Sequence, residues 1–199
     1  MEERAIEDNA VLYPVFMSLA GRRCVMVGGG AVAGRKARRL LQARAEVVVI
    51  SPEVTEELQA MATEVHRRPY GSGDLDGAFL AFVATNSREV NARVVEEANE
   101  RGVPVNVADE PEDGDFLLPS TLRRGRLQVA VSTGGASPVL AREIRARLEG
   151  RFGPEWAGLV EEVRRERRAR LSGEPSEAEV EEFERLKGRV DSCLSRLLG

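Results

Sequence analysis

Short apolar runs alternate with longer segments of mixed apolar and polar positions along the first half of the chain. Four of these runs are rich in Val, Ile or Leu and fit buried β-strands: residues 23–27, 46–50, 80–84 and 105–107. The segments between them fit helices: residues 35–43, 55–63 and 88–101. Ser87 and Gly102 are the expected caps of the last helix. Strands that alternate with helices predict a parallel sheet with right-handed crossovers, covering residues 11 to about 113.

The pattern changes beyond this sheet. Residues 127–131 fit one more strand. Ser137 followed by Pro138 is a helix start signal, and the helix is expected to run to Glu149, before Gly150.

From Pro154 the chain is helical and highly charged. We expect a break at 172–175 and a new helix at Ser176, where Glu179 completes a capping box. The pattern therefore predicts an α/β protein in three parts: a parallel-sheet domain at 1–115, a mixed α/β region at 116–150 and a helical domain at 151–199.

Composition narrows the function classes. The net charge is −4, so we expect no general attraction to nucleic acid. No apolar run approaches the roughly 20 residues of a membrane helix, and the acidic N-terminus is unlike a signal peptide. Cys24 and Cys193 make no disulfide framework, which favours the cytoplasm. The one histidine, His66, is expected to be structural, and we predict no metal site.

The strongest motif is a glycine turn, Gly28-x-Gly30-x-x-Ala33, between the first strand and a helix. Dinucleotide binding needs a first glycine for a tight turn, a second for close approach of a pyrophosphate, and a small third residue for helix packing. Free N–H groups at the helix start would face the phosphates. The alternative is a turn that only closes a strand–helix unit, while a P-loop is disfavoured because no Gly-Lys-Ser/Thr follows. The context favours a Rossmann-type domain.

Polar residues after two strands are candidates for further cofactor contacts. Pro52 and Glu53 follow the second strand, and the Glu53 carboxylate could bind the adenosine ribose. No arginine immediately follows this strand to receive a 2′-phosphate, so we favour NAD over NADP. Thr85 and Asn86 follow the strand at 80–84, on the side where ligands bind in this fold. The alternative for these two residues is helix capping.

Asp109 is the candidate for proton chemistry. It lies just past the strand at 105–107, where a carboxylate could take a proton while a hydride leaves for a nicotinamide. The alternative is that Asp109 is one acid among several in a solvated loop.

A basic region follows within this acidic chain. Residues 118–150 contain six arginines and only two glutamates: Arg123, Arg124, Arg126, Arg142, Arg145 and Arg147, with Glu143 and Glu149. Guanidinium groups suit carboxylates and phosphates, so the region could bind a polyanion; a solvated helix face is the alternative. The loop 132–137, rich in glycine and hydroxyls before a helix, also suits an anion.

Four stretches carry a family resemblance: YPVFMSLAGRRCVMVGGGAVAGRKARRLL, the ATN at 84–86, NVADEPEDGDFLLPS and VAVSTGGASPVLAREIRARLE. Together they resemble the precorrin-2 dehydrogenases of sirohaem synthesis, both the stand-alone enzymes and the N-terminal part of multifunctional sirohaem synthase. The resemblance covers residues 13–150. It implies NAD-dependent oxidation of precorrin-2 to sirohydrochlorin, followed in some members by insertion of ferrous iron.

The resemblance also implies site residues. Six of them are implied to contact the cofactor: Gly28, Gly30, Ala31, Val32, Pro52 and Glu53. Asp109 falls on the family's key aspartate, implicated in dehydrogenation and, where present, chelation. Thr133 falls where some relatives carry a serine in the tetrapyrrole-site loop. Precorrin-2 bears eight carboxylates, so we predict that Thr133 binds substrate together with Ser132, Arg124 and Arg142.

The resemblance further implies a homodimer, with residues 116–150 forming the dimerisation and tetrapyrrole-binding region and residues 151–199 a helical domain. One departure is local: Ala43-Arg44-Ala45 replaces a glycine-containing helix end, so the turn needs a non-glycine cap. Iron insertion stays open. Two other functions stay open as well, an NAD(H)-binding sensor without catalysis and a dehydrogenase of another small acid.

Overall fold

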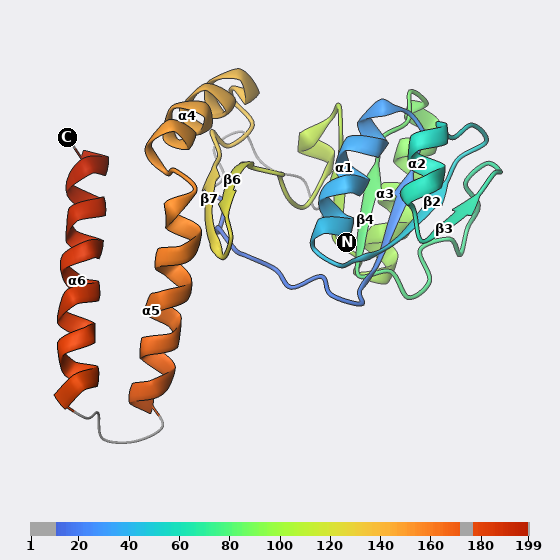
Figure 1. The fold of residues 1–199 in the computed structure, drawn as a ribbon. Helices are drawn as coiled ribbons and strands as arrows, with labels where there is room; N and C mark the ends of the chain where they lie inside the picture. The colour runs from blue at the N-terminus through green and yellow to red at the C-terminus, as the bar shows by residue number, and fades with distance from the viewer. Residues whose placement is uncertain (1–10, 172–176, 199) are drawn as a thin grey trace. The chain divides into compact units, whose positions relative to one another are not determined.

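The computed structural model describes residues 11–171 and 177–198 and divides the chain into two compact units, with the boundary after Leu118 (Figure 1). The proposed helix break at 172–175 and the capping box at Ser176 lie outside the residues whose side chains are described. None of the helices in the described part of the chain combines the length and the apolar character needed to cross a membrane.

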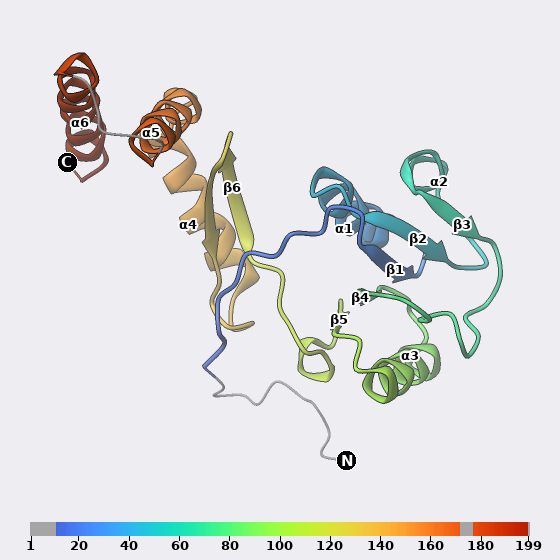
Figure 2. The same cartoon turned by 90° about the horizontal axis from the view of Figure 1, so that it is seen from below.

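The first unit is built on a five-stranded parallel sheet of order β3-β2-β1-β4-β5. Its strands follow one another along the chain: β1 (Arg23–Val27), β2 (Glu46–Ile50), β3 (Glu64–His66), β4 (Leu80–Val83) and β5 (Val105–Val107). Three α-helices connect them: α1 (Ala31–Gln42), α2 (Glu56–Met61) and α3 (Arg88–Arg101). Figure 2 shows α1 and α2 on one face of the sheet and α3 on the other, so the sheet is a middle layer.

Alternation along the strands sorts the core into two layers. On β1, Cys24 and Met26 pack with Ala33, Ala37 and Leu40 of α1, whereas Val25 and Val27 point to the face of α3. Side chains of a strand alternate between faces, so a strand covered on both sides must be apolar throughout. This is why the run CVMV carries no polar position.

The second unit begins with an antiparallel hairpin of β6 (Ser120–Arg124) and β7 (Leu127–Val131). Helix α4 (Pro138–Arg151) packs against this hairpin. Helices α5 (Glu155–Leu171) and α6 (Glu177–Leu198) share a small core of Trp156, Leu159 and Leu186.

The predicted α/β class and most element positions are confirmed. The strands at 23–27, 46–50, 105–107 and 127–131 have the predicted bounds, and α3 runs between a capping Ser87 hydroxyl and a left-handed Gly102 with φ of 66°. The glycine-free end of α1 is closed by Arg44, which adopts φ of 63° and so takes the conformation that glycine usually supplies.

The differences have local causes. Helix α1 begins at Ala31 rather than at residue 35. Gly30, whose backbone is extended, is its N-cap, so the glycine turn leads directly into the helix. Helix α4 passes through Gly150 and ends at Arg151, since a glycine inside a helix weakens it without ending it. Strand β6 was not predicted: its sequence, STLRR, contains one apolar residue, and only Leu122 is buried.

Candidate active site

The glycine turn lies where the carboxyl ends of β1, β2 and β4 meet. The Gly28 N–H donates to the Ile50 carbonyl at 3.0 Å, and the Thr55 N–H donates to the Gly29 carbonyl at 3.0 Å. A Cβ atom on Gly28 would lie 2.2 Å from the Ala84 carbonyl oxygen, and one on Gly29 would lie 1.9 Å from the Glu53 carbonyl oxygen. Gly28 and Gly29 are therefore required by contacts within the chain itself.

Gly30 differs from both of its neighbours. A Cβ atom there would meet nothing within 4 Å, so the absence of a side chain leaves open space beside the backbone. Gly30 is also the N-cap of α1, with no side-chain cap and no acidic residue in the first turn. Helices α2, α3 and α4 instead begin at the capping hydroxyls of Thr55, Ser87 and Ser137.

The first turn of α1 therefore keeps free N–H donors and an uncompensated positive helix end at Ala31 and Val32. Open space and free donors together fit a pyrophosphate, as the fingerprint requires. The third position of the motif, Ala33, is fully buried, where its small size lets α1 pack on β1.

The predicted ribose-side residues lie next to this turn. Pro52 and Glu53 are exposed, and the Glu53 main chain packs on Gly29. After β4, the Thr85 hydroxyl donates to the Asn91 Oδ1 atom at 2.6 Å and accepts from the Ser87 N–H at 3.1 Å. The hydroxyl of Thr85 therefore serves the start of α3, whereas Asn86 is exposed at the same edge.

Asp109 is exposed two residues past the end of β5, at the same carboxyl edge. The chain is fixed on both sides of it. The Ala108 N–H donates to the Val83 carbonyl at 3.0 Å. The Asp115 N–H donates to the Val105 carbonyl at 2.8 Å, and the Asp115 carboxylate accepts from the Val105 N–H at 2.8 Å. A short 3-10 helix, η1 (Pro111–Asp113), lies between these anchors.

Sequence reasoning missed a lysine at the base of the Asp109 loop. Lys36 of α1 donates to the Asn106 Oδ1 atom on β5, and the Asn106 amide donates to the Phe116 carbonyl at 2.7 Å. Burial lowers the pKa of Lys36 to about 8, with the Asp109 carboxylate opposing the shift and Arg39 and Arg35 adding to it. The available signal was the placement of Lys36 on the same side of the helix as the apolar Val32 and Leu40.

The second unit holds the predicted substrate loop. The Ser132 hydroxyl accepts from the Gly134 N–H at 3.1 Å, and the Thr133 hydroxyl accepts from the Ser137 N–H at 2.9 Å. Gly134 and Gly135 adopt positive φ of 63° and 91°. Each hydroxyl still carries its own hydrogen, so the ordered loop can donate to an anion.

The arginines of this unit divide into two groups. Arg124 donates to the Phe152 carbonyl at 2.8 Å and to the Glu149 carbonyl at 3.3 Å, which ties β6 to the end of α4. Arg126 pairs with Glu161 at 3.2 Å. Arg142 is exposed on α4 and forms no hydrogen bond or ion pair with the described residues. Arg124 and Arg126 thus stabilise contacts within the second unit, whereas the guanidinium group of Arg142 is available to bind a ligand.

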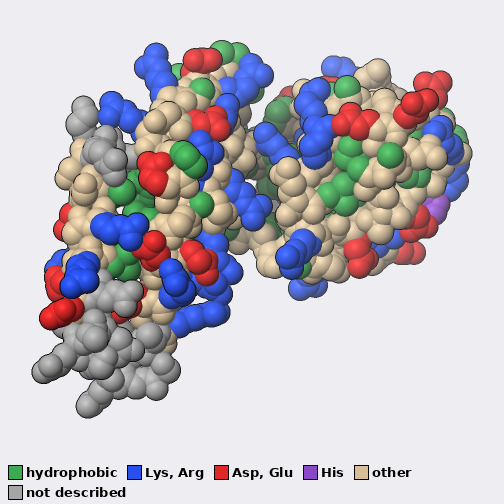
Figure 3. Space-filling view, in the orientation of Figure 1, with side chains coloured by type: hydrophobic (Ala, Val, Ile, Leu, Met, Phe, Trp, Pro, Cys, Tyr) green, Lys and Arg blue, Asp and Glu red, His purple; other side chains and the backbone are tan. Residues whose placement is uncertain are grey.

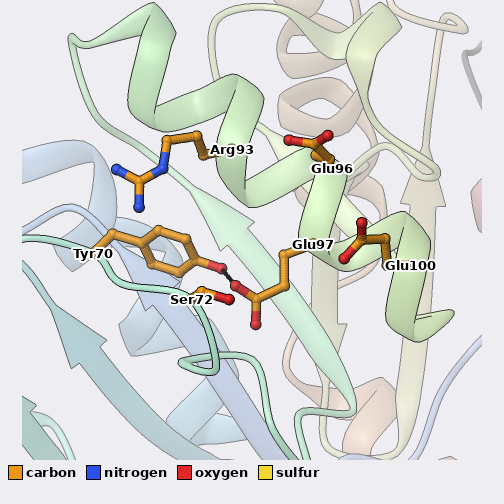
Figure 4. A pocket seen from close by; sticks show the side chains of 6 residues that line it. All are labelled: Tyr70, Ser72, Arg93, Glu96, Glu97 and Glu100. Carbon is orange, nitrogen blue, oxygen red and sulfur yellow. Dashed lines mark hydrogen bonds between the residues drawn. The ribbon is translucent and has the colours of Figure 1, made fainter.

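A pocket of about 210 Å³ lies elsewhere on the first unit (Figure 4). It is lined by Tyr70, Ser72 and four residues of α3: Arg93, Glu96, Glu97 and Glu100. Glu97 within it accepts hydrogen bonds from Tyr70 at 2.6 Å and from the Gly73 N–H at 2.9 Å. Burial alone would raise the pKa of Glu97, but these hydrogen bonds outweigh burial and hold the pKa below its usual range. The network is satisfied and anchors the loop after β3.

Metal ligands do not gather in the described ranges 11–171 and 177–198: no group of three or more His, Cys, Asp or Glu residues is placed to hold an ion. His66 lies on β3, where its Nε2 atom is 3.0 Å from a Glu64 carboxylate oxygen.

The parallel sheet and the open turn at Gly30 define a dinucleotide-binding protein of the Rossmann type. Residues 15–120 match the family described as putative NAD(P)-binding, and residues 124–151 match the central part of sirohaem biosynthesis proteins.

A solved structure titled "SirC, precorrin-2 dehydrogenase" is 31% identical, with a TM-score of 0.74, and the match covers 94% of this chain and 93% of that one. The chain belongs to the precorrin-2 dehydrogenase family. Curated relatives include the sirohaem synthases of Thioalkalivibrio sulfidiphilus, 44% identical over 80% of this chain, and Azotobacter vinelandii, 46% identical over 68%. The matched parts are 34% and 30% of these relatives, so the chain spans about a third of their length.

Proposed function

We propose that this protein oxidises precorrin-2 to sirohydrochlorin with NAD as the oxidant. The proposal is supported by the match to a precorrin-2 dehydrogenase along almost the whole chain and by the relatedness to sirohaem synthases. The observation that carries it is the convergence of an open glycine turn and a carboxylate, Asp109, at one edge of the first unit.

The first unit binds the cofactor. The open space at Gly30 and the free amides of Ala31 and Val32 bind the pyrophosphate, while Gly28 shapes the turn. Glu53 binds the ribose hydroxyls and disfavours a 2′-phosphate, which selects NAD. Pro52, Asn86 and the main chain of Thr85 complete this cofactor set. Bound NAD accepts a hydride.

Asp109 acts as the base. A hydride and a proton leave the macrocycle in the oxidation, and the exposed Asp109 carboxylate accepts the proton. Fixing the chain at Ala108 and Asp115 holds the carboxylate in a defined place, which lowers the cost of reaching the reactive geometry.

The second unit binds the carboxylates of the substrate. Ser132 and Thr133 donate from their ordered loop, and Arg142 supplies a free guanidinium group. Arg124 contributes indirectly, since its donors hold the end of α4. We keep the three-part division, with cofactor binding at 1–115, dimerisation and tetrapyrrole binding at 116–150 and helices at 151–199.

The protein works as a homodimer, and the apolar surface supports this proposal. Val139, Leu140 and Ile144 of α4 are 59%, 51% and 38% exposed, and Tyr13 and Phe16 are 88% and 68% exposed. Exposed apolar side chains of this size mark interaction surfaces. Neither Cys24 nor Cys193 forms a disulfide bond in the described part of the chain, which agrees with a cytoplasmic location.

The test is an anaerobic assay with precorrin-2 and NAD that follows NADH and the product spectrum. Wild-type protein should form NADH and sirohydrochlorin. Asp109→Asn should lower kcat at least about 100-fold, the contribution of a general base, with NAD affinity unchanged. Glu112→Gln is the matched control, because Glu112 is an exposed acid of the same loop and its removal should leave kcat unchanged.

Bound NAD without turnover would contradict the proposal and favour a sensor. Equal losses of kcat in both variants would show that Asp109 acts only as one of several acids in its loop and not as the base. Ferrous ion added after NADH formation tests iron insertion: a metallated product that appears faster than without protein would add this second activity.

A further inference from the structure

Lys36 is the exception among the cations of α1. Arg35, Arg38 and Arg39 of this helix are exposed, and Figure 3 shows Lys and Arg side chains gathered over it. Lys36 instead is half-buried and reaches from α1 to the side chain of Asn106, 70 residues along the chain. A lysine normally keeps its ammonium group in water, so this inward position has a cost that some role must offset.

Asn106 is the second unusual residue. It is 4% exposed and lies between Val105 and Val107, which point to the opposite face of the sheet. Both ends of its amide are used: the carbonyl accepts from Lys36, and the Nδ2 atom donates to the Phe116 carbonyl at 2.7 Å. Asn106 therefore joins α1 to the segment in which the chain returns from the Asp109 loop.

The Asp109 loop is fixed at its base on the same side. The Asp115 carboxylate accepts from the Val105 N–H at 2.8 Å, and the Phe116 ring packs edge-on against Phe82 with centroids 5.6 Å apart. The ammonium group of Lys36 is thus held at the base of the Asp109 loop by Asn106; it forms no ion pair with Asp109 within 4 Å, and the carboxylate acts on it through space. One of its three N–H donors is held by Asn106, and two remain.

We propose that Lys36 is a positioning residue for Asp109: its bond to Asn106 fixes the end of β5 from which the Asp109 loop departs, and its ammonium group places a positive charge on the side of the carboxylate that accepts the substrate proton. This proposal rests on the proposed function. In that step the proton passes from the macrocycle to the Asp109 carboxylate, and the hydride leaves the macrocycle to reduce NAD to NADH. Lys36 keeps its own proton throughout.

Electrostatics support the assignment. The groups that face Lys36 are Arg35 and Arg39 of α1, the neutral Asn106 of β5, and Asp109. Burial, with the two arginines, lowers the pKa of Lys36 to about 8, and Asp109 opposes them. The ammonium group is therefore lost as the pH rises through about 8, and kcat should fall on the alkaline side of the profile.

The experiment compares Lys36→Met and Lys36→Arg with Arg38→Met, which removes an exposed cation of the same helix. We expect Lys36→Met to lower kcat about 10- to 100-fold with unchanged NAD affinity, the range for a misplaced catalytic group. Lys36→Arg should recover part of kcat and lose the alkaline limb, because a guanidinium group stays protonated. Arg38→Met should match the wild type. Thermal unfolding of each variant identifies any loss of fold.

A double-mutant cycle separates positioning from other roles. In the Asp109→Asn background, Lys36→Met should lower kcat by less than twofold, since the residue acts through Asp109. The proposal is overturned if Lys36→Met weakens NAD binding instead of lowering kcat, if the two substitutions are independent, or if Lys36→Met equals the wild type while Asp109→Asn is inactive. An inactive wild-type protein would instead refute the proposed function.

Discussion

Gly29 and Gly30 are neighbours, yet the structure predicts opposite consequences for the same substitution. A methyl group on Gly29 would lie 1.9 Å from the Glu53 carbonyl oxygen, so the loop after β2 would have to move by more than 1 Å. Overpacking against backbone costs about 1–3 kcal/mol or more. Gly29→Ala should therefore lower the free energy of unfolding by at least this amount.

Gly30→Ala should leave the fold almost unchanged. Gly30 has φ of −85° and ψ of −171°, which alanine adopts freely, and its Cβ would meet nothing within 4 Å. Alanine is a poorer N-cap than glycine, so the cost should stay below about 1 kcal/mol, or about 2–4 °C in Tm. The methyl group would occupy the space assigned to the pyrophosphate. We expect NAD affinity to fall at least tenfold, about 1.4 kcal/mol.

The assay pairs denaturant unfolding of both variants with NADH binding followed by fluorescence. Gly30→Ser is a useful companion, because a serine cap should stabilise α1 while it still fills the space. If Gly30→Ala and Gly30→Ser bind NADH as tightly as the wild type, the pyrophosphate does not bind in the open space at Gly30. A loss of stability in Gly30→Ala equal to that of Gly29→Ala would show that the turn is only a structural link.

Three further predictions concern stability and can be checked by denaturant or thermal unfolding. Glu97→Gln should destabilise the first unit by about 1–3 kcal/mol near neutral pH, because a buried acceptor of several hydrogen bonds is weakened. Since the folded pKa of Glu97 is depressed, its contribution is present above the ordinary carboxylate pKa of about 4.3 and is lost as the pH falls through the folded value; the variant should approach the wild type in acid, and a constant difference would contradict this. Arg44→Gly should raise stability by about 0.5–1 kcal/mol, because an exposed non-glycine residue at φ of 63° is strained, and a decrease would show that the arginine side chain matters. Arg124→Met should destabilise the second unit by about 1–2 kcal/mol through the freed carbonyls of α4, and substrate KM should change less than in Arg142→Met; the reverse order would assign Arg124 to the substrate.

The parts predicted from sequence are those set by neighbouring residues. Ser87 and Gly102 define α3 because a cap acts within one turn, and the spacing of Gly28, Gly30 and Ala33 reports a local turn. Continuous apolar runs were enough to place β1 and β2, because strands buried on both faces are apolar at almost every position.

The parts that escaped prediction depend on residues far apart in the chain. Gly29 is explained only by the carbonyl of Glu53, and Lys36 only by Asn106, so neither role exists until the sheet has formed. Side chains alternate between the two faces along β5, so Val105 and Val107 point to the other face and Asn106 faces Lys36. The bonds of Arg124 to the carbonyls of Phe152 and Glu149 could not be predicted either, because a pattern of charges does not reveal which carbonyls a guanidinium group will meet; its role toward the substrate stays a prediction.

The N–H of Gly28 is bonded to Ile50, and a Cβ on Gly28 or Gly29 would collide with backbone of β4 or of the loop after β2. The turn therefore cannot open by local fraying. The bonded Gly28 amide should exchange with solvent only when the whole sheet unfolds, at the slow rate of the central strands, whereas the free amides of Ala31 and Val32 should exchange quickly. NAD would then bind to a glycine turn that is already ordered, so little of the binding free energy is spent on ordering it. Saturating NAD should slow amide hydrogen exchange throughout the first unit, because it stabilises the folded state as a whole.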